Sequence, residues 1–403
     1  LGVRYKNKGD SQRALQQLQF VLNALAQIGI QGAKRLIEQQ DAWFHHQGSR
    51  QRDALALVVH ALGDMHQPLH MGSLYLDGEG KPYDPDQQGA DAQREIVDDL
   101  DRGVLTDLPS SVWGAPPDGT WATSRAEALV RLHHFVEHVL PVFGPHEDAM
   151  LTASWHLAHS MLAQYLNIGL LHPREVVEAA EAAYRAGRVP IASAEGFVRQ
   201  VVGWREYVWC LYWWFGADYV SQNVLGADRP LPPAFTGTPT KMRCVASTLQ
   251  TLHDHSWAHH IQRLMVLGNL ALLAGVDPWA MTKWMWAGFV DGAEWVMLPN
   301  VVGMALHADG GRMATKPYAA GGAYIDRMSD YCKGCVFDRT KRTGDDACPF
   351  TTLYWDFMAR HAERFVRNPR MAQQVRAAER LGDLPAVRER AVEVLGLLDA
   401  GLL

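Results

Sequence analysis

The protein has 403 residues, of which 48% are hydrophobic and 20% are charged, and its formal net charge is -6. That length allows two or three domains with a full hydrophobic core, and the composition is ordinary for a globular protein. The negative balance excludes a general electrostatic attraction to nucleic acid, so contact with DNA requires a local basic patch. No apolar run is long enough to span a membrane, since the longest, Leu264–Gly275, contains Asn269.

The start of the chain and its cysteine content indicate the cellular compartment in which we expect the protein. The chain begins at Leu1 without a basic-then-apolar leader, so we expect no signal peptide. The absence of a starting methionine suggests a fragment of a longer reading frame. Five cysteines, an odd number in so long a chain, do not fit a secreted disulfide framework. Clustered thiols in a reducing compartment are better explained as metal ligands.

Hydrophobic periodicity predicts helices over most of the chain. Residues 11–70 carry leucines and valines on one helical face. Residues 72–123 accumulate Gly, Pro and Asp, which is typical of a loop-rich connector, with one short helix over about 92–100. Beyond Ser124 the predicted helices cover residues 124–140, 149–166, 174–187, 193–214, 242–273, 277–295, 323–330, 349–366 and 371–399.

These elements predict a mainly α protein in three parts, because we find no convincing strand and no repeat. Residues 1–75 form a short helical piece and residues 76–123 form the connector. Residues 124–403 should be one long helical domain with a single core.

A histidine-rich motif, His60-Ala-Leu-Gly-Asp64-Met-His66-Gln-Pro-Leu-His70, lies near the N-terminus. The spacing of His60 and Asp64 places both on one helical face, as metal ligands require. The motif resembles the core of zinc-dependent single-strand nucleases and phospholipases, in which the residues matching His60, Asp64 and His70 bind zinc. That family's N-terminal Trp, and its later His with an Asp four residues on, are missing. We therefore expect a truncated nuclease-like fragment without a complete zinc site.

Four of the five cysteines lie between Cys244 and Cys348. Cys332-x-x-Cys335 is followed, after twelve intervening residues, by Cys348 and Pro349, and Cys244 lies upstream. Four thiolates suit either tetrahedral zinc or an iron–sulfur cluster, and spacing alone does not decide between them. The close spacing of the first pair disfavours four ordinary buried cysteines.

Tryptophan is concentrated in one region, since nine of the fourteen lie between Trp204 and Trp295. Aromatic side chains at helical spacing are usually core residues. Indole is also large and oxidisable, so some of these residues could pass electrons to a buried redox cofactor.

Longer motifs then occur in one order along the chain: Gly203-Trp-Arg-Glu-Tyr207, Ala258-His-His-Ile-Gln-Arg-Leu-Met265, Gly268-Asn269, Leu298-Pro-Asn300, Thr315-Lys-Pro-Tyr318, Tyr324-Ile-Asp-Arg-Met-Ser-Asp-Tyr-Cys332 and Ala347-Cys-Pro-Phe350. Together they resemble the flavin domain of DNA photolyases and cryptochromes. The resemblance is to the bacterial branch that carries an iron–sulfur cluster, the prokaryotic (6-4) photolyases. It covers about residues 124–403.

The resemblance implies an FAD in the helical domain and a four-iron (4Fe-4S) cluster on Cys244, Cys332, Cys335 and Cys348. It also implies cofactor-binding roles for Ser160, Trp204, Arg205, Glu206, Arg263, Asn269, Asp291 and Asn300. Arg263 and Asp291 would form the charged pair near the flavin ring. Flavin chemistry needs an apolar pocket with a few fixed polar groups, which agrees with this set. A surface pair of Arg205 with Glu206 is the alternative interpretation.

His259 and His260 correspond to the family's lesion-side histidines. A histidine with a pKa near neutral can move a proton to a damaged base during repair. We favour His260 for that step, and a core role for His259. The resemblance also implies a route of aromatic residues along which electrons reach the flavin. Trp284 is retained on that route, and Trp286 could substitute for a neighbouring aromatic residue of the route.

The chain also departs from the family pattern. Met297 stands where an acidic residue is usual near the flavin edge, and Met285 and Ala293 replace tyrosines beside the tryptophan route. The family's N-terminal α/β antenna domain is absent, so light capture would fall to FAD alone. The nuclease-like piece in its place indicates either a natural fusion or a misjoined frame.

Three functions follow from these features. The first is light-driven repair of UV-damaged DNA, in which reduced FAD donates an electron to a flipped lesion, here a (6-4) photoproduct. The second is a cryptochrome-like photoreceptor without repair activity, and the third is a zinc hydrolase centred on His60. We expect a monomer in the bacterial cytoplasm that binds damaged DNA and no membrane.

Overall fold

The computed structural model describes residues 114–115 and 119–403. The predicted N-terminal piece, with His60, Asp64 and His70, lies outside the described residues, as does most of the connector. In the described part, helices follow one another from Arg125 onward, and β-type pairing is limited to isolated bridges. The prediction of a mainly α protein is confirmed.

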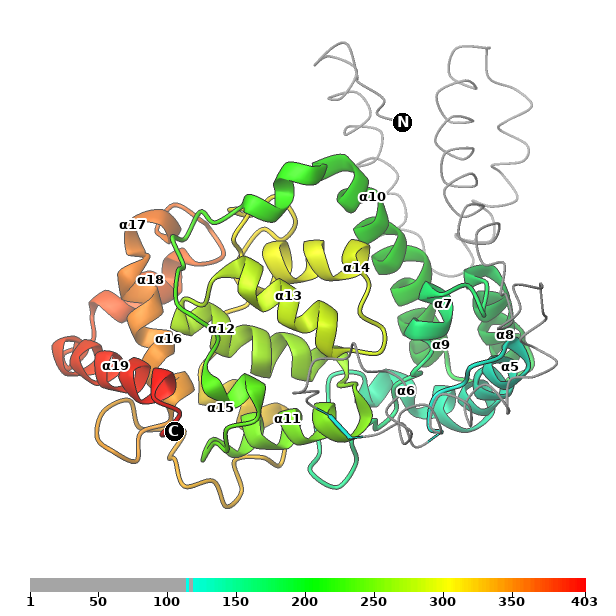
Figure 1. The fold of residues 1–403 in the computed structure, drawn as a ribbon, viewed down its shortest axis with the longest axis horizontal. Helices are drawn as coiled ribbons and strands as arrows, with labels where there is room; N and C mark the ends of the chain where they lie inside the picture. The colour runs from blue at the N-terminus through cyan, green and yellow to red at the C-terminus, as the bar shows by residue number, and fades with distance from the viewer. Residues whose placement is uncertain (1–113, 116–118) are drawn as a thin grey trace, which may run out of the picture.

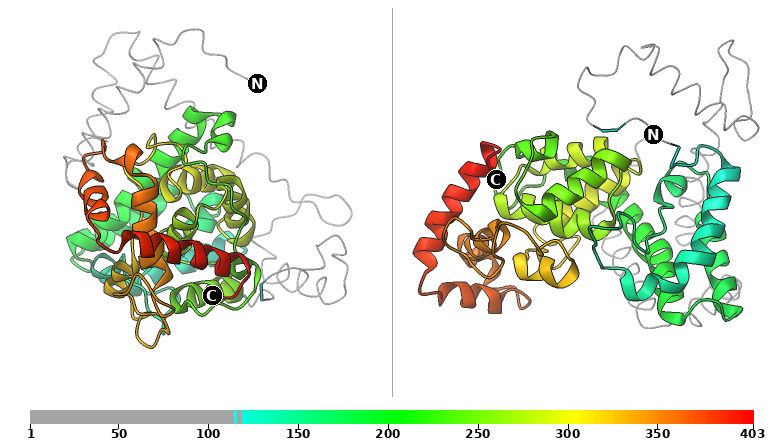
Figure 2. Two further views of the ribbon diagram at one scale, coloured as in Figure 1. Left: turned by 90° about the vertical axis from the view of Figure 1, so that its left-hand side faces the viewer. Right: turned by 90° about the horizontal axis from the view of Figure 1, so that it is seen from below.

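Two groups of helices can be distinguished in Figures 1 and 2, and a continuous helical segment joins them. The smaller group contains α5 (Arg125–His134), the π-helix η1 (Phe135–Val139), α6 (Leu140–His146), α7 (Ala163–Asn167), α8 (Pro173–Arg185) and α9 (Ile191–Val198). It begins with a capping box, because the Ser124 side chain accepts from the Glu127 amide and Glu127 accepts from the Ser124 amide. Its core includes Phe135 and Phe197, whose rings lie 4.6 Å apart.

The larger group contains α11 (Arg243–His255), η5 (Gln262–Gly268), α12 (Asn269–Ala274), α13 (Pro278–Gly288), α14 (Glu294–Leu298), η6 (Pro299–Ala305), α15 (Gly322–Met328), α16 (Pro349–Arg360), α17 (Ala362–Phe365), α18 (Ala372–Glu379) and α19 (Leu384–Asp399). Every residue of α12 is buried, so this helix lies at the centre of the group. α16 packs against α12, α18 and α19 and closes the core on one side.

The connection between the groups runs through η2 (Arg199–Arg205) and α10 (Glu206–Phe215), which follows the upper edge of the molecule in Figure 1. The chain then passes through two short 3-10 turns, η3 (Ala217–Ser221) and η4 (Pro233–Thr236), before α11. α10 ends at Gly216, whose φ of 70° lies in the region that favours glycine.

The predicted helix over 149–166 is wrong for most of its length, because only α7 is helical there. Leu157 and Met161 have φ values of 45° and 53°, which a helix does not accommodate. The side chain of His159 contacts the carbonyl oxygens of His156 (2.9 Å) and Glu147 (3.0 Å) and so holds the turn. Side-chain contacts of this kind compete with helix formation and leave no trace in hydrophobic periodicity.

Two longer predicted helices are each divided. The helix predicted over 242–273 breaks at Ser256, whose left-handed backbone (φ 50°) ends α11. The helix predicted over 277–295 breaks after α13, where the chain turns sharply at Gly292. A Cβ atom at Gly292 would lie 2.3 Å from the carbonyl oxygen of Trp286, so the turn requires glycine.

Candidate functional site

A wide cleft lies between the two helix groups and is lined by residues of both. Its empty volume, including the part open to solvent, is about 2090 Å³. Apolar side chains such as Phe143 and Leu162 line it from the smaller group, and Met265 and Val301 line it from the larger. The cleft therefore has the predominantly apolar character of a cofactor site.

Arg263 and Asp291 form the charged pair of this cleft, as the sequence predicts. Arg263 Nη2 donates to Asp291 Oδ2 at 3.0 Å, and Nη1 lies 2.9 Å from Oδ1, so both carboxylate oxygens lie close to the guanidinium. The guanidinium carbon lies 4.1 Å from the centre of the Phe289 ring. Asn167 of α7 donates to the Asp291 carbonyl oxygen at 2.9 Å, which ties the smaller group to the wall. Both charges are largely buried and paired, which fixes their orientation.

Five of the other six predicted cofactor residues fall at or beside the cleft. Trp204 and Arg205 line it from η2, whereas Glu206 lies behind them and pairs with Arg205 (Nη1 to Oε1, 2.6 Å). Ser160 and Asn300 also line it. Asn269 does not line the cleft: it is fully buried and exchanges two hydrogen bonds with the Ala320 backbone, at 2.8 and 3.0 Å.

The two candidate histidines occupy different environments. His260 lines the cleft with a half-exposed side chain, and its Nε2 lies 3.3 Å from Asp148 Oδ1. His259 is 1% exposed and stacks on His159, with ring centres 4.3 Å apart. Burial lowers the pKa of His259 well below its usual range and lowers that of His159 to about 4. Of the two candidates, His260 is the one that a bound ligand can reach.

Several cleft residues were not singled out from the sequence: Asp148, His159, Asn167, Trp257, Trp295 and Tyr324. Asp148 contacts His260 across 112 positions of the chain, so no local spacing could reveal that contact. The hydrogen bond from His260 lowers the pKa of the Asp148 carboxyl. Trp295 is one of fourteen tryptophans, and the residues next to it in the sequence do not distinguish it as a cleft residue.

The predicted electron-transfer residues lie outside the cleft lining. Trp284 donates from Nε1 to the Phe235 carbonyl oxygen at 2.8 Å and packs against the Phe235 ring at 4.8 Å. Trp286 is 38% exposed. Between them, Met285 points its side chain toward the cleft and lines it, as does Met297. Two of the family's altered positions therefore touch the cleft directly.

The four clustered cysteines come together around one small cavity. Cys244, Cys332, Cys335 and Cys348 all line it, with an empty volume of about 340 Å³, and no disulfide joins them. Cys210 lies elsewhere, on α10. In the ranges that the structure covers, no three His, Cys, Asp or Glu side chains are arranged to hold a single metal ion.

Burial governs the chemistry of these thiols. Desolvation raises the pKa of Cys332 to about 12 and also raises the pKa values of Cys244 and Cys348. Metal coordination deprotonates such thiols because the cation stabilises the thiolate. Gly322 lines the same cavity, and a Cβ atom there would lie 2.8 Å from Cys348 Sγ, so the backbone approaches the site closely.

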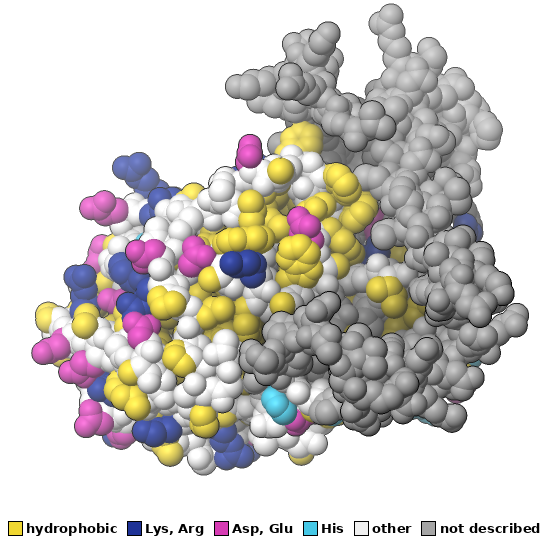
Figure 3. Space-filling model, in the orientation of Figure 1, with side chains coloured by type: hydrophobic (Ala, Val, Ile, Leu, Met, Phe, Trp, Pro, Cys, Tyr) yellow, Lys and Arg dark blue, Asp and Glu magenta, His cyan; other side chains and the backbone are white. Residues whose placement is uncertain are grey.

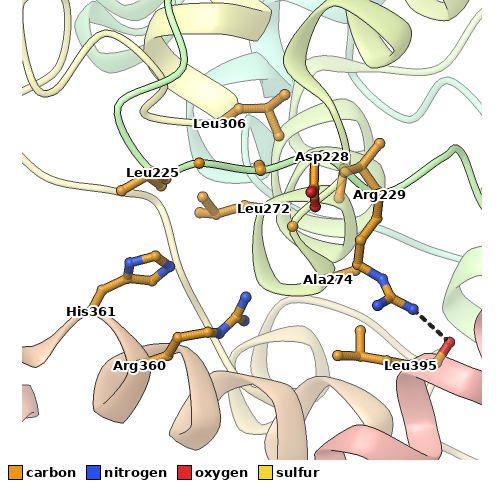
Figure 4. Close-up of a pocket in the computed structure, with 14 residues that line it drawn as sticks. Leu225, Asp228, Arg229, Leu272, Ala274, Leu306, Arg360, His361 and Leu395 are labelled. Carbon is orange, nitrogen blue, oxygen red and sulfur yellow. Dashed lines mark hydrogen bonds between the residues drawn. The ribbon is translucent and has the colours of Figure 1, made fainter.

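A further cavity, drawn in Figure 4, lies between α12, α16 and α19. Arg229 donates to the Leu395 carbonyl oxygen at 3.1 Å and pairs with Asp399. Arg360 donates to the Leu273 carbonyl oxygen at 2.8 Å and to Asp356 at 3.1 Å. Both guanidinium groups serve to join helices, and we assign this cavity a structural role.

Comparisons with known proteins place these observations in context. A scan against models of protein families found no match. A (6-4) photolyase of Agrobacterium fabrum is 46% identical over 280 residues, which are 70% of this chain and 54% of that protein. Two uncharacterized proteins of Acanthamoeba polyphaga mimivirus, R855 and R853, are 32% and 35% identical over 101 and 93 residues, which are 75% and 71% of their lengths.

Two solved structures overlap the fold in part. A bacterial class III photolyase from Agrobacterium tumefaciens gives a TM-score of 0.45 at 18% identity, covering 74% of this chain and 61% of that chain. A Synechocystis sp. PCC6803 cryptochrome gives 0.39 at 16% identity, covering 48% and 42%. We therefore base the family relation on the sequence match and draw no argument from these two structures. In the described residues, no helix has both the length and the apolar character needed to cross a membrane.

Proposed function

Because the chain belongs to the bacterial photolyase/cryptochrome family, we propose that it binds FAD in the cleft and repairs UV-damaged DNA under light, with (6-4) photoproducts as the lesion. The chain spans about half the length of the (6-4) photolyase that it matches. The observation that carries the proposal is the cleft itself, in which the Arg263–Asp291 pair and His260 line one apolar space.

The residues present fit a flavin dinucleotide. The cleft is roomy and mostly apolar, and its few polar groups are held in place by partners. Arg205 lines it, and the buried Nε of that side chain has no acceptor among the described protein atoms. A bound ligand with acceptor oxygens or ring nitrogens would satisfy that donor. When bound, reduced FAD supplies the light-driven electron that starts repair.

The protein's own contribution at the lesion side is positioning and proton supply. His260 faces the cleft, and the Asp148 carboxylate beside its Nε2 favours the tautomer with the proton on that nitrogen. When Nδ1 also carries a proton, that proton can pass to a base flipped into the cleft, while the Nε2 proton stays hydrogen-bonded to Asp148. Buried His259 supports this wall without contacting the ligand, which agrees with the preference for His260.

DNA recognition would require basic residues at the rim of the cleft, since the net charge of the whole chain is negative. Three basic residues of the segment between Cys335 and Cys348 are paired with carboxylates: Arg339 with Asp326, Lys341 with Asp346 and Arg342 with Asp383. Lys316, by contrast, lies 5.9 Å from the ring of Tyr318, which lines the cleft. Among these basic residues, Lys316 is therefore our first candidate for a contact with a DNA phosphate.

The proposal includes a four-iron cluster on Cys244, Cys332, Cys335 and Cys348. Its support is that the four thiols line one cavity, as the resemblance to the family's cluster-binding cysteines leads one to expect. The cluster would supply structural cross-linking of four chain segments. Iron and sulfide analysis of the purified protein, against zinc analysis of the same sample, tests the choice.

A photoreceptor without repair activity is the second candidate. Its support is that Met285 and Met297, which replace a tyrosine and an acidic residue of the family pattern, both line the cleft. Neither methionine can donate a proton or carry a charge, so the flavin environment differs from that of the repair enzymes. The monomeric state and the cytoplasmic location stay predictions from the sequence.

Illumination of chemically reduced protein with damaged oligonucleotides separates the two functions. We expect repair of the (6-4) lesion and none of the cyclobutane lesion. His260→Ala should retain FAD and lose repair, whereas His253→Ala, at an exposed position paired with Asp254, should keep both. FAD binding and photoreduction with repair of neither lesion would assign the photoreceptor function.

A further inference from the structure

Two exposed histidines form a pair on the smaller helix group, away from the cleft. His134 is the last residue of α5, and His138 lies in η1. Their ring centres lie 5.0 Å apart, at an interplanar angle of 51°. Both residues are exposed, and the side chain of His138 is 63% exposed. Neither lines the cleft or the cysteine cavity, so the pair has no part in the sites described above.

The backbone at this pair is fixed from the inner side of the helix. Side chains four positions apart lie on one face of a helix. Here that face crosses the junction of α5 and η1, and single π-helical turns of this kind are frequent at functional sites. Phe135, between the two histidines, is 1% exposed, and its ring lies 4.6 Å from that of Phe197 and 6.4 Å from that of Phe143. The core therefore holds the turn that presents the two imidazoles to solvent.

The spacing of the two rings suits a shared metal ion. A metal ion bound to an imidazole nitrogen at about 2.0–2.1 Å lies about 3.2 Å from the centre of that ring. Two imidazoles that bind one ion at an angle of about 90–110° therefore have ring centres about 4.5–5.2 Å apart. The observed separation of 5.0 Å lies in this range. Because both side chains are exposed, each ring can turn a nitrogen toward the ion without disturbing the core.

The charges beside the pair do not oppose a cation. Arg131, one turn earlier on α5, donates from Nη2 to the Thr120 carbonyl oxygen at 2.8 Å, which directs its guanidinium to that carbonyl. Glu137 supplies a negative charge next to the pair, with its Oε2 3.8 Å from His138 Nε2. On the face drawn in Figure 3, described histidine side chains are sparse among those of Lys, Arg, Asp and Glu, so exposed histidine is not a general feature of that face.

We propose that His134 and His138 form a two-histidine site for a divalent late first-row transition metal ion, such as Ni²⁺ or Cu²⁺. Imidazole nitrogen is a preferred ligand of these ions, whereas Mg²⁺ and Ca²⁺ prefer oxygen. On binding, two neutral imidazole nitrogens replace two water ligands of the ion, and water fills its other positions. No electron or proton is transferred. The site requires neither FAD nor an iron–sulfur cluster, so it goes beyond the proposed function.

A bound ion joins α5 to η1 and so supports one wall of the cleft from outside. The helix brings the two imidazoles together, so the folded protein chelates the ion more strongly than the unfolded chain does, and this difference stabilises the fold. Phe135 lies between the two ligands in the sequence, and its ring partners Phe143 and Phe197 both line the cleft. The metal site therefore gives the smaller helix group a reversible cross-link outside the cleft.

The test is a calorimetric titration of the full-length protein with Ni²⁺, repeated in excess Mg²⁺. His134→Gln and His138→Gln each remove one imidazole and keep a polar side chain, and the double variant removes both. His133→Gln is the matched control, because His133 is exposed, precedes His134 on the same helix and has no ring contact with His138 in the described structure. Comparison between variants removes the contribution of Ni²⁺ bound elsewhere in the chain. Urea unfolding with and without Ni²⁺ is the second measurement.

We expect His134→Gln and His138→Gln each to weaken Ni²⁺ binding at one site by at least about tenfold, because chelation needs both linked ligands. The double variant should match either single variant, His133→Gln should match the parent, and Mg²⁺ should not compete. Ni²⁺ should raise the urea midpoint of the parent and of His133→Gln only. The absence of such a site from the parent, additive effects of the two histidines, an equal effect of His133→Gln or displacement by Mg²⁺ would overturn the proposal. None of these outcomes bears on FAD binding or repair.

Discussion

Acidification should destabilise this protein through His159, which is buried in the wall of the cleft. Its side chain is 7% exposed, and its two ring nitrogens lie 2.9 and 3.0 Å from the carbonyl oxygens of His156 and Glu147. Burial, reinforced by the nearby His260, lowers the pKa of His159 from 6.5 to about 4, against the opposing effect of the two carbonyls. The folded protein therefore keeps this imidazole neutral at pH values where the unfolded chain protonates it.

The sign and size of the effect follow from proton linkage. Between pH 6.5 and about pH 4 the unfolded state binds more protons at this position than the folded state, so stability falls as the pH falls. For a pKa shift of this size, the loss of unfolding free energy between pH 7 and pH 5 is about 2 kcal/mol. That is a large part of the stability of an ordinary domain.

Urea unfolding at pH 7 and pH 5 measures this loss directly. His159→Gln retains hydrogen-bonding capacity without a titrating ring, so its stability should fall less than that of the parent protein by about 2 kcal/mol. The lowered pKa values of His307 and His361 act in both proteins and cancel in the difference. Burial, the largest cause of the lowered pKa of His259, also remains in the variant, whereas the smaller contribution of His159 to that pKa is removed. His138→Gln, at an exposed position, is the control and should keep the parent's pH dependence. An equal pH dependence in His159→Gln and the parent would refute the reasoning.

Two further predictions concern the proposed cofactor sites. Asp291→Asn leaves the Arg263 guanidinium without its carboxylate counter-charge, so urea unfolding should show a loss of about 3 kcal/mol. FAD should also dissociate more readily on gel filtration, and an unchanged FAD content would contradict the assignment of this pair. Cys348→Ser should lose bound iron and its visible absorption, whereas Cys210→Ser should retain both. Equal iron content in the two variants would show that the cysteine cavity is not the metal site.

The sequence indicated correctly those features that depend on local pattern. Apolar residues at helical spacing predicted most of the helices, because each helix buries one face against the core. The resemblance to the family grouped the four cysteines, and the structure places them around one cavity although Cys244 lies 88 positions before Cys332 in the chain. The Arg263–Asp291 pair was likewise expected and is formed.

Features that depend on distant side chains could not be read from the sequence. The turn before α7 is held by His159 contacts with carbonyl oxygens, and the α11 break is set by the left-handed backbone at Ser256. The contact between His260 and Asp148 depends on how the two helix groups pack, which periodicity does not specify. The same is true of Trp295, whose place in the cleft is decided by the position of α14 against α10.

Buried hydrogen bonds of Gln262 connect the cleft to the cysteine cavity, and this would link retention of the proposed cofactor to the integrity of the proposed metal site. Gln262 is 1% exposed: its Oε1 accepts from the His259 amide at 3.2 Å, and its Nε2 donates to the Tyr331 hydroxyl at 2.8 Å. Tyr331 lines the cysteine cavity and precedes Cys332 in the chain. A change that moves the segment with Cys332 must move Tyr331 or break this buried bond, which costs about 1–3 kcal/mol. The position of His259 therefore depends in part on the segment that carries Tyr331 and Cys332. Damage at the proposed cluster would then disturb the side of the cleft that carries the histidines, although no residue lining the cleft is changed.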